Sequence, residues 1–387
     1  MRINPIDQLV ERALSSAAHK SKLIMIVAAS CLVSGAVHAE TLGYVVTNWN
    51  FAGQYTEGGK LECPSGFNPD NRDNFRATFK TEEEREEALK KYANFEMRFR
   101  GPNGESDLYN PDLVHDPLPF TDAKGTISTG VNLDGTPDGG ATDKTCKHTK
   151  FSSPDGRPGI DNQMYRVTGC NRGTRPDGLF DVFFNNEIIT KQTNRWLVEV
   201  SGVDSRENDN HVDVVVAHGL DKLVQDASGG FVPGLSQRVD HAMPRYIARS
   251  TGRIENGVLI TDPFTQVILP TTSFLEEGEH HLKNMVLRLD LKPTGASGSM
   301  SAYHDVDRYY RFWAKTTGLH GVSNIVSPPS FWAALKRNAD GFKDPATGVC
   351  TAISAVYDLK LVSAFIVHKP QSVASVENSG LKTANER

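Results

Sequence analysis

The sequence lacks the motifs that mark the common families of enzymes and nucleotide-binding proteins. It has no GxSxG nucleophile elbow, no HExxH zinc motif, no Walker loop for phosphate and no GxGxxG. It also has no CxxC pair and no CxxCH segment, which argues against a zinc ribbon and against covalent haem attachment. The sequence therefore identifies no nucleophile or cofactor, and catalytic residues stay unknown.

Long hydrophobic runs are missing as well. The longest, Leu23–Val33, is too short for a transmembrane helix, which needs about 20 residues. It follows basic residues between Arg12 and Lys22 and precedes the small-residue site Val37-His38-Ala39. We therefore expect residues 1–39 to be an export signal cleaved near Ala39, with a retained anchor as the alternative. The mature chain is expected to carry no transmembrane segment.

An excess of positive charge is also absent. Removing residues 1–39 from the 387 leaves 348 residues with 38 basic and 45 acidic side chains, a net charge of −7. A surface of this sign argues against nucleic acid or an anionic membrane as a partner. The sequence leaves open whether the exported protein is periplasmic or secreted.

Cysteines are few, and four of the five lie beyond the signal: Cys63, Cys146, Cys170 and Cys350. An even number in an exported chain predicts two disulfides, for which three pairings exist. Our first expectation joins Cys146 to Cys170, because this bond would close the base of the loop between them. The second bond would then join Cys63 to Cys350.

That loop belongs to a stretch rich in Asp, Gly, Pro and Thr, from Asn132 to Cys170. Calcium takes six to eight oxygen ligands, and the candidate ligands are Asn132, Asp134, Asp138, Asp143, Asp155, Asp161 and Asn162. The stretch does not match an EF-hand, because Pro137 stands where the sixth position requires glycine. Ordinary turns formed by Asp, Asn and Gly explain the same composition. A calcium site and a set of turns are the two interpretations.

The spacing of apolar and polar residues predicts many short strands and few helices. Strands are expected at 42–52, 126–133, 196–200, 212–216, 264–269 and 285–291, with two more between Cys350 and His368. A further strand segment, 254–260, contains Asn256-Gly257, the strongest short hairpin signal. Helices are expected at 81–98, 177–191, 303–315 and 329–337, the first opened by a Thr81–Glu84 capping box. This order predicts a mainly β fold, an antiparallel β-sandwich or jelly roll with several peripheral helices.

One β-rich domain with insertions is expected over residues 40–368. A division near 244–251 into two β domains is the alternative, because 348 residues is long for one sandwich. Residues 369–387 have few large apolar side chains and are expected to form a flexible tail.

Other polar and aromatic groups carry weaker signals. Asp240-His241 resembles an acid–base pair, but neighbouring residues on a strand point to opposite faces. The acidic and histidine cluster from Glu276 to His281 has no motif spacing, so a solvated loop is the simpler interpretation. Tyr309, Tyr310 and Trp313 have helical spacing and suit core packing, while aromatic groups of this kind also stack on sugars.

Three segments, Gly43–Ala52, Val131–Gln163 and Ala339–Tyr357, resemble a set of exported bacterial proteins of unknown function. The most distinctive part of the resemblance is GIDNQ, Gly159 to Gln163. The resemblance covers most of the mature chain and implies export and a single structural unit. It implies no activity, cofactor or catalytic residue.

We expect a non-enzymatic exported protein that binds a ligand, such as a carbohydrate, or an envelope partner, with the 132–162 loop ordered by calcium as a secondary expectation. The first alternative is a periplasmic or secreted glycan hydrolase that uses two loop carboxylates. Glycosidases need two carboxyl groups roughly 5–9.5 Å apart, which a sequence does not supply. The second alternative is a structural component of the envelope.

Overall fold

A computed structural model describes residues 39–55, 60–70, 73, 76–91, 101–114, 118–176, 178–273, 276–315 and 327–368. The described residues from Glu40 onward belong to one compact unit. The expected signal (apart from Ala39), the expected tail and the end of the first expected helix lie outside the described residues. Within the described residues, no helix is both long enough and apolar enough to cross a membrane.

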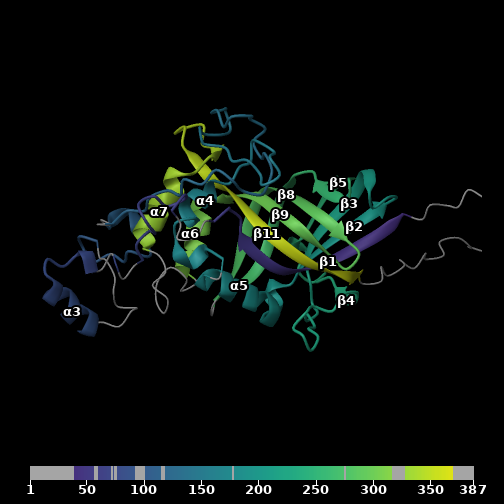
Figure 1. The fold of residues 1–387 in the computed structure, drawn as a ribbon, viewed down its shortest axis with the longest axis horizontal. Coiled ribbons are helices and arrows are strands. Elements are labelled where there is room, and N and C mark those ends of the chain that lie inside the picture. Colours follow the sequence, from purple (N-terminus) through teal and green to yellow (C-terminus); the bar gives the residue numbers. More distant parts are fainter. Residues whose placement is uncertain are drawn as a thin grey trace, which may run out of the picture. The chain divides into compact units, whose positions relative to one another are not determined.

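Eight antiparallel strands close into one barrel, which Figure 1 shows with its strands side by side. Around the barrel the order is β1 (Glu40–Phe51), β2 (Trp196–Val203), β3 (Asn208–His218), β5 (Ile247–Glu255), β6 (Val258–Thr261), β8 (Glu276–Lys292), β9 (Gly295–Asp305) and β11 (Cys350–Val367). β5 begins inside the stretch where a domain division was the alternative, and it pairs with β3 in this sheet.

The prediction of mainly antiparallel β structure is confirmed, but the sandwich or jelly roll is wrong. The reason lies in β11, which is one strand of 18 residues where the sequence pattern suggested two. Its length lets it pair with β9 on one side and with β1 on the other, and the second pairing closes the sheet. Alternating apolar residues are common to sandwiches and barrels, so the pattern alone does not distinguish them.

Three short or peripheral strands extend the barrel. β4 (Leu235–Arg238) pairs in parallel with the end of β11, β7 (Phe264–Ser273) pairs with β8, and β10 (Gly341–Lys343) pairs with the start of β11. β10 matters most for the site described below, because its Gly341 lies against the ring of Tyr303 on β9.

Apolar side chains fill the barrel interior. Val212, Val214 and Val216 of β3 point inward and belong to the main core, whereas Val215 and Ala217, which point to the opposite face, belong to a separate outer cluster. An eight-stranded barrel has an interior just wide enough to be filled by side chains. Among the described residues, the interior is therefore a packed core.

Five α-helices are described: α3 (Glu82–Lys91), α4 (Gln163–Thr168), α5 (Leu179–Thr190), α6 (Val306–Lys315) and α7 (Pro328–Arg337). Short 3-10 turns occupy Pro111–Leu113, Arg172–Thr174, Gln192–Asn194 and Pro244–Tyr246. Figure 1 shows α4 to α7 gathered at one end of the barrel. The Thr81–Glu84 capping box is confirmed by reciprocal hydrogen bonds of 3.2 Å. The helix expected from Tyr303 begins at Val306, because β9 continues through Asp305.

Two disulfides are present, in the pairing that the sequence analysis did not favour. Cys63 bonds to Cys170, and Cys146 bonds to Cys350. The expectation that Cys146 joins Cys170 is wrong, because the segment around Cys146 lies against β10 and the start of β11. There the Cys146 amide donates to the carbonyl of Asp340 at 2.9 Å. Nearness along the chain gave no information about this long-range contact.

Candidate functional site

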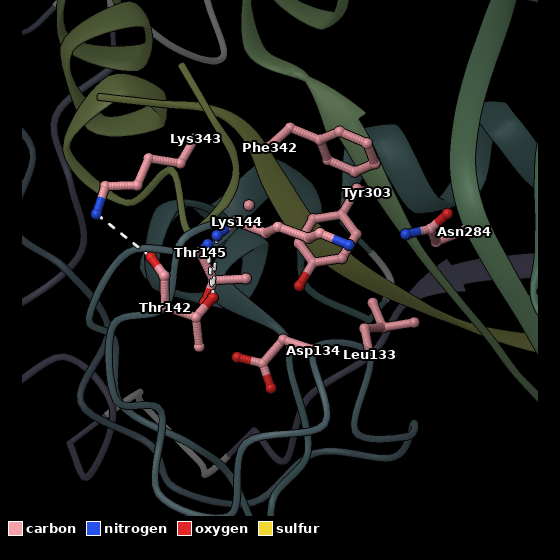
Figure 2. A pocket seen from close by; sticks show the side chains of 10 residues that line it. Leu133, Asp134, Thr142, Lys144, Thr145, Asn284, Tyr303, Phe342 and Lys343 are labelled. Atoms are coloured by element: carbon pink, nitrogen blue, oxygen red, sulfur yellow. Dashed lines mark hydrogen bonds between the residues drawn. The ribbon is translucent and has the colours of Figure 1, made fainter. Parts of the chain in front are cut away.

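A cavity of about 480 Å³ opens where the Asp-rich stretch meets β8, β9 and β10. Figure 2 shows the side chains that converge on it from loop and strands. The lining residues are Leu133, Asp134, Thr142, Lys144, Thr145, Asn284, Tyr303, Gly341, Phe342 and Lys343. A volume of this size is in the usual range for small-molecule sites.

Two aromatic rings form one wall of the cavity. The rings of Phe342 and Tyr303 meet edge to face, with centroids 5.5 Å apart. Phe342 has a φ of 53°, a left-handed conformation that is unusual for a bulky residue. A Cβ atom on the preceding residue, Gly341, would lie 2.4 Å from the Tyr303 ring. Glycine at 341 therefore allows the close approach that places the Phe342 ring over Tyr303.

Cationic and amide groups surround these rings. Lys144 and Lys343 both line the cavity, and the Lys343 ammonium donates to the carbonyl of Thr142 at 3.4 Å. Lys283 lies over the Phe342 ring, 4.8 Å from its centroid. Asn284 lies at a bulge in the β8–β9 pairing and has a φ of 50°. Bulges of this kind redirect side chains and are frequent next to functional sites.

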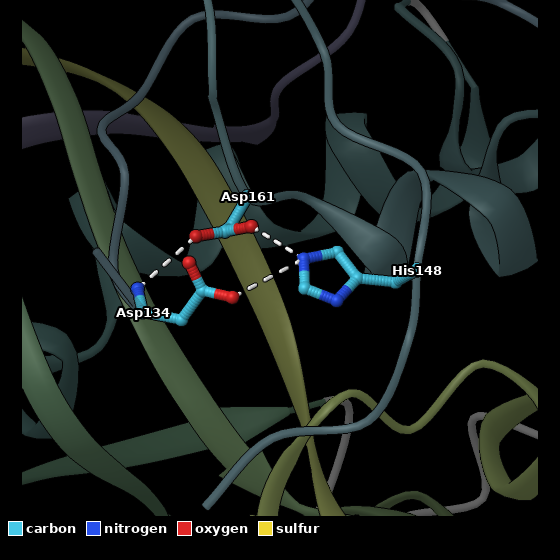
Figure 3. A group of neighbouring side chains, drawn as sticks. All are labelled: Asp134, His148 and Asp161. Atoms are coloured by element: carbon cyan, nitrogen blue, oxygen red, sulfur yellow. Dashed lines mark hydrogen bonds and ion pairs between the residues drawn. The ribbon is translucent and has the colours of Figure 1, made fainter. Parts of the chain in front are cut away.

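A buried cluster of charged groups lies behind the cavity, at Asp134. Figure 3 shows Asp134, His148 and Asp161 pointing toward one another. The Nε2 atom of His148 lies 2.8 Å from Asp161 Oδ1 and 3.7 Å from Asp134 Oδ2. The two carboxylates are fully buried, and the imidazole is 4% exposed. We call this set, with Asp340 and Lys150, the carboxylate cluster.

Asp340 approaches the same histidine nitrogen from the turn before β10. Its Oδ2 atom lies 3.9 Å from His148 Nε2, is buried and has no hydrogen-bond partner among the described residues. Its other oxygen, Oδ1, accepts a hydrogen bond of 2.7 Å from the Ser354 amide of β11. Three carboxylates, from three separate parts of the chain, therefore surround one imidazole nitrogen.

Lys150 neutralises part of this negative charge. Its ammonium lies 2.5 Å from Asp134 Oδ1 and 2.5 Å from Asp161 Oδ1, and 3.3 Å from the amide oxygen of Asn132. The lysine side chain is 7% exposed. A buried carboxylate pair of this kind is tolerable only with such a partner, because unpaired buried charges are strongly destabilising.

The surroundings shift the proton affinities of these groups. Burial, the strongest influence on His148, lowers its pKa, but the hydrogen bonds to Asp161 and to the Cys146 carbonyl outweigh burial and raise it. Burial raises the pKa of Asp340 to about 7. Burial also raises the pKa of Asp134, yet hydrogen bonds from Lys150 and Thr136 overcome this effect and the net shift is downward.

The Tyr303 hydroxyl belongs to the same surroundings. It is buried and has no hydrogen-bond partner among the described residues. Burial raises the pKa of Tyr303, and the charges of Asp340, Asp161 and Asp134 raise it further. Tyr303 therefore stays neutral, with its ring toward the cavity and its hydroxyl in the field of the cluster.

Local hydrogen bonds fix the turn that carries Asp134. Asn132 accepts from the Gly135 amide at 2.8 Å, and Asp134 accepts from the Thr136 amide at 2.8 Å. These are Asx-type turns, as the sequence composition suggested. Asp161 then holds the turn in place, because its Oδ2 accepts from the Leu133 amide at 2.8 Å.

The GIDNQ segment connects this turn to the barrel. Asp161 enters the carboxylate cluster, and Ile160 is buried. Asn162 is buried and bonds the carbonyl of Ala52, the Ser128 hydroxyl and the amide of Val356. Asp161 therefore supplies a charged group to the carboxylate cluster, and the next residue, Asn162, attaches the segment to β11.

The structure brings together only part of the set expected to bind calcium. Asp134 and Asp161 share the cluster, and Asn132 reaches it through Lys150. Asp138 and Asp143 are exposed, Asp155 pairs with Arg157, and Asn162 serves the attachment described above. Calcium binding by the full set stays a prediction.

Other sequence candidates lie apart from the cavity. Asp240 pairs with His218 at 3.1 Å, while His241 faces His368. His280 is buried under Trp49 and Phe312, whereas His281 bonds Glu279 at 3.0 Å. The expected solvated loop at Glu276–His281 is therefore wrong: these residues belong to β8, and pairing with β7 buries His280.

Sequence reasoning missed His148, Lys150, Asp340 and Tyr303. A signal existed for two of them, because His148 and Lys150 alternate and an extended chain places them on one side. No sequence signal points to Asp340, which lies almost two hundred residues further along. Its approach depends on β10 and on the Cys146–Cys350 bond.

Comparison of the chain with protein-family models, with curated proteins and with solved structures finds no match.

Proposed function

We propose that the protein is an exported binding protein for a small acidic sugar, which it holds in the cavity between the Asp-rich stretch and β8–β10. The observation that carries this proposal is the combination of the partly exposed ring of Phe342 with two cavity lysines, Lys144 and Lys343. An aromatic face stacks on the apolar face of a sugar ring, and an ammonium attracts a carboxylate.

The remaining lining supports the same ligand class. Asn284 offers an amide, and Thr142 and Thr145 offer hydroxyl groups, which suit the hydroxyls of a sugar. The cavity volume of about 480 Å³ fits one or two sugar rings by the usual size of ligand sites. Two disulfides support an oxidising compartment and so support export.

Binding is supported better than glycan hydrolysis by the state of the loop carboxylates. Asp134 and Asp161 are fully buried, and both pair with Lys150. A glycosidase needs one carboxyl group to donate a proton to substrate and another to attack it or activate water. Asp134 lines the cavity, but both carboxylates are paired with Lys150, and this pairing supports a fixed structural role better than the proton donation and attack that hydrolysis requires.

Isothermal titration with a matched pair of sugars tests the proposal. Galacturonate differs from galactose by the carboxylate, so we expect it to bind at least about tenfold more tightly, the usual scale of a charge-assisted hydrogen bond. Lys343→Met should weaken galacturonate binding by about tenfold and leave galactose unchanged. Lys222→Met, an exposed lysine away from the cavity, is the control.

A result in which neither sugar binds at millimolar concentration would contradict the proposal. Equal affinity for both sugars would contradict the role given to the lysines. Glucuronate is tested in parallel, so that a preference for one stereoisomer is not mistaken for a lack of binding.

A further inference from the structure

The carboxylate cluster poses an electrostatic problem that its own hydrogen bonds leave unsolved. The Nδ1 atom of His148 lies 2.8 Å from the carbonyl oxygen of Cys146, so Nδ1 must carry a proton and donate it. In neutral imidazole the other nitrogen, Nε2, then bears a lone pair. That lone pair would face Asp161, Asp134 and Asp340 at 2.8, 3.7 and 3.9 Å.

This nitrogen therefore needs either a proton or a metal ion between it and the carboxylates: a proton on Nε2 can be donated to Asp161 at 2.8 Å, whereas a metal ion can bond all three carboxylates. The Lys150 ammonium does not neutralise all three, because it contacts Asp134 and Asp161 through their Oδ1 atoms only. The Oδ2 atom of Asp340 is buried beside the same nitrogen and has no hydrogen-bond partner in the part of the chain that the structure describes. An unsatisfied buried carboxylate oxygen is costly, and binding a cation would satisfy it.

We propose that the carboxylate cluster is a binding site for one divalent transition-metal ion of the zinc or manganese type, held by His148 Nε2 and by the carboxylates of Asp134, Asp161 and Asp340. This site goes beyond the proposed sugar binding and stands without it. One imidazole and three carboxylates form a mixed nitrogen and oxygen set, which suits these ions better than calcium.

The distances agree with such a site. Donor atoms of a tetrahedral centre with bonds of about 2.1 Å lie roughly 3.4 Å apart. The three carboxylate oxygens lie 2.8 to 3.9 Å from the histidine nitrogen, so shifts of a few tenths of an ångström admit an ion. The ligand atoms of Asp134, His148 and Asp161 all lie within 4.8 Å of one another.

Charge and the surrounding hydrogen bonds agree as well. With neutral His148, three carboxylates and one ammonium leave two negative charges, which a divalent ion balances. The Nδ1–H bond to the Cys146 carbonyl is the outer contact that usually orients a metal-binding histidine. Cavities reach the site from two sides, one lined by Asp134 and another, of about 310 Å³, lined by His148.

Equilibrium dialysis of the chelator-treated protein, with metal counted by mass spectrometry, tests the proposal. Zn²⁺, Mn²⁺ and Ca²⁺ are used separately. We expect one equivalent of Zn²⁺ or Mn²⁺ per chain, with at least about 100-fold weaker binding in His148→Gln and Asp340→Asn. Asp340→Asn keeps an oxygen for the Ser354 amide, so it is expected to fold even if His148→Gln does not.

Two controls separate this site from its competitors. His368→Gln removes a surface histidine that lies 3.3 Å from His241 and 2.9 Å from Glu199. Asp143→Asn removes an exposed acid of the expected calcium set. Both variants should bind Zn²⁺ or Mn²⁺ as the unaltered protein does.

Three results would overturn the proposal. The first is no binding of Zn²⁺ or Mn²⁺ above background, which would mean that the His148 position holds a proton only. The second is binding that survives in His148→Gln and Asp340→Asn but is lost in His368→Gln. The third is binding of Ca²⁺ alone that depends on Asp143. A sugar result of either sign does not affect these outcomes.

Discussion

Among single residues, Lys150 balances part of the negative charge of the carboxylate cluster. It is the cation that contacts both Asp134 and Asp161, and all three side chains are buried. Lys150→Met keeps most of the apolar stem but leaves two buried carboxylates with less compensation. Removing one partner of a buried ion pair typically costs about 3–5 kcal/mol.

We therefore expect Lys150→Met to lower the free energy of unfolding by about 3–5 kcal/mol, measured by urea denaturation without added metal. Lys360→Met, an exposed lysine on β11, is the matched control and should change stability by less than about 0.5 kcal/mol. A Lys150→Met protein as stable as the control would mean that the carboxylates do not depend on the ammonium.

At the scale of elements, the site depends on how β10 and the Asp-rich stretch are joined. Thr145 forms a bridge with Gly341, and the Lys343 amide donates to the carbonyl of Lys144 at 2.9 Å. The Cys146–Cys350 bond holds the same two segments together. These contacts place the loop lysine Lys144 beside Phe342 and Lys343 of β10.

Removing this disulfide should therefore affect both stability and ligand binding. We expect Cys146→Ala with Cys350→Ala to lower the free energy of unfolding by about 2–4 kcal/mol and to weaken galacturonate binding. Removal of Cys63 and Cys170 in the same way should lower stability but keep ligand affinity, because that bond lies away from the cavity. Equal loss of affinity in both double variants would contradict the role given to Cys146–Cys350.

The sequence predicted element types better than their connections. The alternating strands β2 and β3, the Asn256–Gly257 turn and helices α5 and α7 follow from local patterns. The closed barrel and the disulfide pairing depend on β11, whose two edges both find partners far away in sequence. The pattern of residues within a strand does not determine which distant strand it pairs with.

Local sequence patterns also predicted only part of the site, because some of its residues come from distant parts of the chain. The Asp-rich stretch was identified as the place to look, and two of its carboxylates do meet. Their partners His148 and Lys150 lie in the same stretch, but a pattern of oxygen ligands for calcium does not include a histidine or a lysine. Asp340 and Tyr303 reach the cluster only through the packing of β9, β10 and the loop.

At the scale of the whole molecule, the barrel interior makes the fold sensitive to acid. His304 is buried, and its Nε2 atom lies 2.7 Å from the Tyr357 hydroxyl. Burial lowers the pKa of His304 from its usual value of 6.5 to about 3. Below pH 6.5 this histidine is protonated in the unfolded chain, whereas in the folded chain it stays neutral down to about pH 3.

This difference stabilises the fold above pH 6.5 and is lost as the pH falls toward 3. The expected contribution from His304 is a loss of about 1.4 kcal/mol for each pH unit in this window. We expect His304→Gln to show a shallower fall in unfolding free energy between pH 6.5 and 4.5 than the unaltered protein. Parallel pH profiles for the two proteins would exclude His304 as the source.

In the proposed metal site, the loop, β10 and the barrel together hold a cation in front of His148. Anomalous diffraction at the zinc edge, from crystals soaked in zinc, tests whether they do. We predict one strong peak about 2.1 Å from His148 Nε2 and within bonding distance of the Asp134, Asp161 and Asp340 carboxylates. The contradicting result is a well-ordered His148, still hydrogen-bonded to Asp161, with no anomalous peak between them.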